Sequence, residues 1–117
     1  MHVEIASRNL SLKAETREFI ERRLELVLKQ FEDQIERVWV AVRDIKRNCD
    51  GEDKQCRIVV DLSCSGSVRK VHVATSIESA ASQAIDWAAA AVALVVERRR
   101  RVSEIRGDNQ STLQMIE

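Results

Sequence analysis

Apolar residues recur with the period of an α-helix in two stretches of the chain, residues 14–32 and 77–104. The recurring positions are Ile20, Leu24, Val27 and Phe31 in the first stretch, and Ile85, Ala89, Val92 and Val96 in the second. Ser76 precedes the second stretch in the position of an N-cap, and Gly107 follows it as a helix stop. The pattern therefore predicts two amphipathic helices, the second followed by a short loose tail.

Four shorter stretches have the alternation or the β-branched runs that are typical of strands, and they span residues 2–6, 37–43, 55–64 and 68–74. The last two are joined by Gly66 and its neighbours, which predict a tight reversal. The polar segment 46–54 is expected to be a flexible loop. The order β-α-β-β-β-α predicts an α+β domain of two layers, in which two helices pack on one face of a four-stranded sheet.

The length of 117 residues is enough for one domain, and we expect residues 1–106 to form it and residues 107–117 to be the tail. The 19 basic and 19 acidic side chains cancel, which argues against coating nucleic acid by bulk charge but allows a local basic patch. Aromatic residues, at 3%, leave little for base stacking.

The first residues do not have the pattern of a signal peptide, and polar side chains interrupt the apolar segment 80–96. We therefore expect no membrane partner. Three cysteines without a secretory signal indicate free thiols in a reducing cytoplasm.

Motifs for catalysis or metal binding are missing from the sequence. Cys49, Cys56 and Cys64 are too far apart for a CxxC pair, and the two histidines have no ligand-like spacing to them. The chain has no glycine-rich phosphate loop, no nucleophile elbow and no zinc-helix motif. The sequence predicts a protein that is not an enzyme, with no catalytic residues, no metal site and no cofactor.

Three segments resemble one known family in their order and spacing. They are HVEIASRNL at residues 2–10, REFIERRL at 17–24 with KQFE at 29–32, and AID at 84–86 before a helix that ends in RRRR at 98–101. Together they resemble the ribosome hibernation promoting factor family, which includes ribosome-associated inhibitor A and is also labelled sigma-54 modulation protein. The chain is similar to a short form of this family, which does not have the C-terminal dimerisation domain.

The resemblance implies a fold like that of a double-stranded-RNA-binding domain and a role in stress. Family members bind the small ribosomal subunit, its RNA and its proteins, near the decoding region and keep translation silent. Guanidinium and ammonium groups on the two helices would then contact rRNA phosphates. The candidates are Arg17, Arg22, Arg23, Lys29, Arg98, Arg99 and Arg101. The alternative is that these cations pair with glutamates on the helix surface or oppose the helix dipole.

Other apolar residues of the two helices fall outside the predicted core stripes. These are Phe19, Leu26, Trp87, Ala91 and Leu94. The family usually has basic residues at the positions of Leu26 and Ala91. An exposed apolar patch with a tryptophan often marks a partner surface, so the alternative function is a homodimerising or protein-binding domain. The other interpretation is that the helices shield these side chains from each other.

Overall fold

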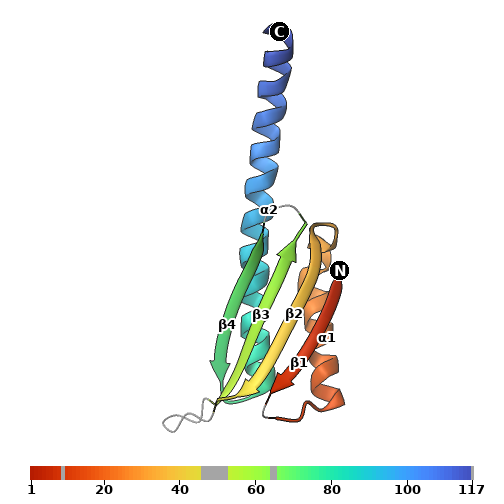
Figure 1. Cartoon of the computed structure of the whole chain (residues 1–117), viewed down its shortest axis with the longest axis vertical. Helices are drawn as coiled ribbons and strands as arrows, with labels where there is room; N and C mark the ends of the chain where they lie inside the picture. Colours follow the sequence, from red (N-terminus) through yellow and green to blue (C-terminus); the bar gives the residue numbers. More distant parts are fainter. Residues whose placement is uncertain (9, 46–52, 64–65, 117) are drawn as a thin grey trace.

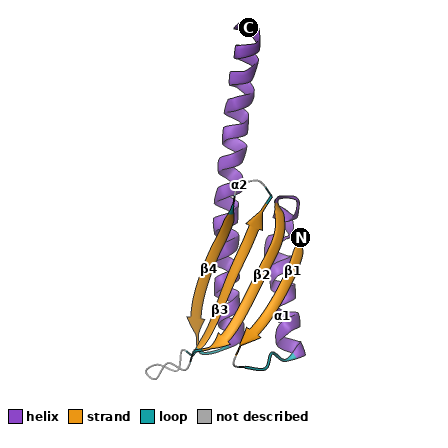
Figure 2. Cartoon of the chain, viewed as in Figure 1, coloured by secondary structure: helices purple, strands orange, loops and turns teal. Residues whose placement is uncertain are grey.

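The structure is a computed structural model of the chain, and it describes residues 1–8, 10–45, 53–63 and 66–116, with side chains as far as Val102. A four-stranded sheet forms one layer and two helices form the other (Figures 1 and 2). The elements are β1 (His2–Arg8), α1 (Ala14–Leu28), the 3-10 helix η1 (Lys29–Gln34), β2 (Ile35–Asp44), β3 (Lys54–Leu62), β4 (Ser67–Ala74) and α2 (Ile77–Ile116). This architecture confirms the predicted α+β fold and its element order.

The strands lie in the order β1-β2-β3-β4. β1 pairs parallel with β2, because α1 carries the chain back to the starting end of the sheet, whereas β2–β3 and β3–β4 are antiparallel. The carbonyl of Gly66 accepts a hydrogen bond from the amide of Leu62 in the β3–β4 connection, and the φ of Gly66 is 82°. A glycine suits this left-handed conformation, as the predicted reversal requires.

One core lies between the sheet and the helices. Alternation along β2 and β3 directs apolar side chains to the helix side of the sheet, among them the fully buried Val38 and Ile58. The predicted stripe of α2 is entirely buried, and Ile20, Leu24 and Leu28 of α1 meet it. The Oγ of Ser76 accepts a hydrogen bond from the amide of Ser79, which confirms the predicted N-cap.

Both helix ends differ from the prediction. α1 ends at Leu28 and tightens into η1, so Phe31 is only half-buried. α2 continues to Ile116, and the predicted stop at Gly107 is wrong. A single glycine inside a helix costs about 1 kcal/mol relative to alanine, and no proline follows it to end the helix. The predicted loop 46–54 lies almost entirely outside the described residues.

α2 extends well beyond the sheet (Figure 1), and the molecule measures 65 × 28 × 18 Å. By length and composition alone, Ile77–Val102 is long and apolar enough to cross a membrane, although polar side chains interrupt the segment 80–96. The stripe of this helix that includes Ile85 and Val92 is buried in the core. This burial is the arrangement of a core helix, and a membrane is not needed to explain its apolar composition.

Candidate nucleic-acid interface

Two of the candidate cations on α1 are exposed and weakly held. The guanidinium of Arg17 donates a hydrogen bond of 3.4 Å to the carbonyl of Ile5 in β1. The guanidinium of Arg22 lies 4.0 Å from the carboxylate of Glu18, one turn earlier. Exposed pairs of this kind contribute about 0–1 kcal/mol, so both side chains can exchange these partners for a phosphate at little cost.

Arg23 has a different environment, because it joins the two helices. Its Nη2 lies 2.8 Å from both carboxylate oxygens of Asp86 on α2. Its Nε is buried and has no hydrogen-bond partner within the described structure. Thr16 makes a second link between the helices, since its hydroxyl donates to the carboxylate of Glu78 at 3.1 Å. The charge of Arg23 is therefore already neutralised by Asp86, and a phosphate would have to displace that carboxylate.

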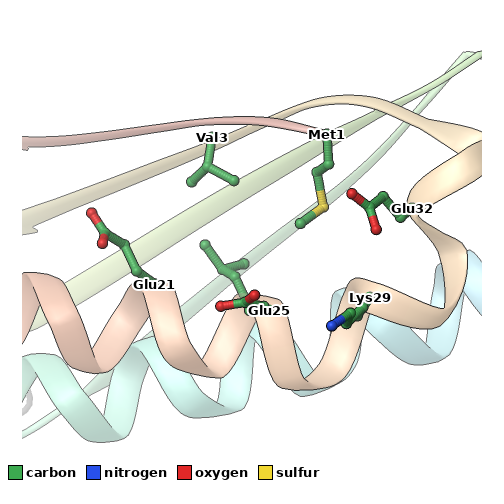
Figure 3. A pocket seen from close by; sticks show the side chains of 7 residues that line it. Met1, Val3, Glu21, Glu25, Lys29 and Glu32 are labelled. Carbon is green, nitrogen blue, oxygen red and sulfur yellow. The ribbon is translucent and has the colours of Figure 1, made fainter.

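Lys29 lines a groove of about 620 Å³ between the start of the chain and α1 (Figure 3). Three carboxylates of α1 and η1 line the same groove, and Met1, Val3 and Leu24 add apolar walls. The carboxylates belong to Glu21, Glu25 and Glu32. A groove lined by three carboxylates and one cation is unsuitable for a phosphate.

The basic end of α2 begins where the helix leaves the sheet. Arg98 and Arg101 are exposed and lie three residues apart, so they share one side of the helix, whereas Arg99 is half-buried. The guanidinium of Arg101 pairs with Glu97 at 2.6 Å. Arg98 and Arg101 are therefore the best-placed candidate cations on α2 for a phosphate.

Four of the five apolar candidates are exposed, but the five do not share one surface. Leu26 is 76% exposed and lines a hollow on α1 together with Phe19. Trp87 is 54% exposed and its ring meets His72 of β4 edge-on, with 5.2 Å between ring centroids. Leu94 is also exposed and Ala91 is half-buried. The structure therefore separates the α1 residues from the α2 residues.

Metal and thiol chemistry find no support in the described ranges. No group of three or more His, Cys, Asp or Glu side chains there could hold a metal ion. Burial raises the pKa of the Cys56 thiol from 9.0 to about 12, so this thiol stays neutral and unreactive. Cys49 and Cys64 lie outside the described residues.

The sequence interpretation missed the face of the sheet that the helices do not cover. We call it the open sheet face; its outward residues include Trp39 and five arginines, Arg8, Arg37, Arg43, Arg57 and Arg69. Figure 1 looks onto this face, with the helices behind the sheet. The signal was present in the alternation, because outward positions of β2 and β3 carry Arg, Trp and Gln between the inward Val and Ile residues.

No protein-family model matches the sequence, and a search of curated proteins found no match. Solved structures do match the fold. The Protein Y N-terminal domain of Thermus thermophilus aligns with a TM-score of 0.64 and 23% identity, over 79% of this chain and 96% of that one. A ribosomal subunit interface protein from Coxiella burnetii aligns with a TM-score of 0.61 and 13% identity, over 86% and 99%. The comparison confirms the fold that the resemblance implied: the chain has the fold of the Protein Y N-terminal domain.

Proposed function

We propose that this chain is a ribosome-associated translation inhibitor of the hibernation type, which binds the small ribosomal subunit near the decoding region. The observation that carries the proposal is the fold, which is shared almost end to end with a protein described as a ribosomal subunit interface protein. The chain would act by occupying the space of messenger and transfer RNA, so it would work in the cytoplasm and needs no catalytic group.

The exposed cations would supply the phosphate contacts. The best candidates are exposed to solvent, and the contacts that they make are weak enough for a phosphate to replace them. They are Arg98 and Arg101 on α2 and Arg17 and Arg22 on α1. Arg23 would contribute only after leaving the carboxylate of Asp86, and Arg99 only after moving from its half-buried position. Lys29 would contribute only if the phosphate tolerated the three carboxylates that line the same groove.

Sucrose-gradient co-sedimentation with purified ribosomal subunits tests the proposal. We expect the chain to travel with the small subunit and to dissociate as salt rises, because each phosphate contact releases counterions. Arg98→Glu should weaken co-sedimentation about tenfold or more, since one charge-assisted contact becomes a repulsion. Lys13→Glu is the matched control for Arg98, because it reverses one exposed charge at the N-cap of α1, on the other helix from the basic end of α2.

Two results would contradict this assignment. If folded protein stays out of every ribosomal fraction at low salt, the proposed function is wrong. If Arg98→Glu and Lys13→Glu weaken binding equally, general charge rather than the basic end of α2 mediates the contact.

The exposed side chains of Trp87 and Leu94 favour a second candidate function, a homodimer formed through this side of α2. Ala91 lies between them on the helix, and Phe19 and Leu26 would form a separate contact on α1. Light scattering after size exclusion should then show a dimer, and Trp87→Glu should show a folded monomer. Gln30→Glu adds the same charge at an exposed position of η1, outside this side of α2, and is the control that should leave the dimer intact. A monomeric unmodified chain would reject this candidate.

A further inference from the structure

The charges of this chain are distributed unevenly between its two layers. The outward register positions of the sheet carry five arginines against two acidic residues, Glu4 and Asp61. α1 carries four glutamates, at Glu15, Glu18, Glu21 and Glu25, against three arginines. A net charge of zero therefore conceals a basic open sheet face, which favours a negatively charged partner.

A hollow of about 250 Å³ lies within this face. Ala6 and Ala41 are register partners whose small side chains leave space between the neighbouring arginines. Arg8, Arg43 and Arg57 line the hollow. The guanidinium of Arg43 donates to the neutral amide of Gln55 at 2.6 Å, so this bond does not cancel its charge.

Among the described residues, no carboxylate neutralises the three arginines. Arg8 and Arg43 are direct cross-strand partners, and like charges in such a pair are destabilising. None of the described residues that line the hollow carries a carboxylate, and Arg57 forms no ion pair with any of the residues that the structure describes. A phosphate in this hollow would relieve the repulsion and accept hydrogen bonds from the guanidinium groups.

Trp39 lies beside the hollow, two residues before Ala41 on the same face of β2. Its indole Nε1 donates a 2.9 Å hydrogen bond to the carboxylate of Glu4, and the guanidinium carbon of Arg37 lies 5.1 Å from its ring centroid. Hydrogen bonds from His2 and Trp39 lower the pKa of Glu4, so this carboxylate stays ionised and holds the ring in place. Aromatic rings and guanidinium planes on an open sheet are surfaces on which nucleobases stack.

We propose that the open sheet face binds single-stranded RNA, with phosphate oxygens in the hollow lined by Arg8, Arg43 and Arg57 and a base stacked at Trp39. The juxtaposition of an anion-binding hollow and an aromatic ring fits a nucleotide, whereas an acidic peptide would use the charges without the ring. The choice of RNA over DNA rests on the ribosome association proposed above. The binding of a nucleic-acid strand rests only on the arginines and Trp39 of the open sheet face.

Fluorescence anisotropy with a labelled ten-nucleotide oligouridine tests this proposal on the full chain. We expect salt-sensitive binding that Trp39→Leu weakens about tenfold, the usual effect of losing one stacked base. Arg57→Gln should also weaken binding about tenfold and should reduce the slope of log affinity against log salt by about 0.7, the value for one phosphate of a single strand. Lys13→Gln removes the same charge from α1 and should change neither quantity. Circular dichroism confirms that each variant is folded.

The outcomes separate this proposal from the proposed function. If oligouridine does not bind, or binds Trp39→Leu and Arg57→Gln as well as the unmodified chain, the RNA site is wrong. The RNA site would also be wrong if polyglutamate bound as tightly as oligouridine and Trp39→Leu did not weaken that binding. The face would then be a surface for acidic proteins. Equal binding of a deoxyuridine strand would overturn the choice of RNA. The chain could bind oligouridine through Trp39 and yet not co-sediment with ribosomes. That result would reject only the proposed function.

Discussion

Leu24 and Leu26 show how position on a helix decides the role of a residue. Leu24 is fully buried in the core, whereas Leu26 is 76% exposed. An α-helix turns about 100° per residue, so two residues of separation place these identical side chains on nearly opposite sides of α1. The periodic pattern alone assigned Leu24 to the core stripe and left Leu26 outside it, and the structure confirms both assignments.

Alanine substitutions at these two positions should therefore differ sharply. Leu24→Ala removes a core side chain and should lower the free energy of unfolding by about 2–5 kcal/mol. Leu26→Ala on the same helix should change it by less than about 0.5 kcal/mol. Urea unfolding followed by circular dichroism measures both values. A similar loss from the two substitutions would contradict the packing of α1.

The thiol of Cys56 gives a chemical test of burial at the residue scale. With a pKa of about 12, it is neutral near pH 8, and the thiolate is the form that reacts with alkylating agents. Iodoacetamide should therefore modify Cys56 only in denaturant, as site-resolved mass spectrometry would show. Rapid modification in the native protein would show that this part of β3 opens to solvent.

Between elements, the contact of α1 with α2 depends on residues far apart in the sequence. Arg23 and Asp86 are 63 positions apart and meet at 2.8 Å. Neither has an opposite charge three or four positions away on its own helix, where ion pairs within a helix form. The pattern could therefore predict that Arg23 lacks a carboxylate partner on its own helix, but not that Asp86 of the other helix would be the partner.

A double-mutant cycle measures this link. Arg23→Ala, Asp86→Ala and the double variant should give a coupling of at most about 1 kcal/mol, because the two side chains are 35% and 46% exposed and solvent screens their attraction. The pair formed by Arg22 and Glu18 is a suitable comparison and should give less, since its atoms are 4.0 Å apart. A coupling of several kcal/mol would mean that the pair is far better shielded from water.

For the whole molecule, the division into residues 1–106 and 107–117 stays a prediction. The helix continues through this boundary, so secondary structure does not mark it. Packing gives a better criterion: Val96 is the last buried side chain of α2 within the described range. Stability should follow the buried residues, because burial of apolar area is the main favourable contribution to folding.

Truncation tests where the folded unit ends. A chain that ends after Arg106 should keep the unfolding midpoint of the full chain, since every buried side chain of the described core is retained. A chain that ends after Leu94 loses Val96 from the core and Val95 beside it, and its stability should fall by about 2 kcal/mol or more. Equal stability of both truncated chains would place the end of the unit before Val95, and a large loss at Arg106 would extend it beyond that residue.

Local sequence patterns determined the helices and strands of this protein. The backbone gives each type of element a fixed period, and the spacing of apolar residues along the sequence shows that period directly. They gave the element order, the N-cap at Ser76, the buried stripe of α2, and the Ile20 and Leu24 positions of the α1 stripe, whereas Val27 and Phe31 of that stripe are only half-buried. They did not give the end of α2, since one glycine is too weak a signal to stop a helix.

Only the tertiary structure decided which charged side chains are available to bind a partner. It paired Arg23 with Asp86, placed Lys29 among carboxylates and gathered arginines from four strands around Trp39 on the open sheet face. The physical reason is that Coulomb interactions and hydrogen bonds depend on distances in space, and these distances are set when segments far apart in the sequence pack together.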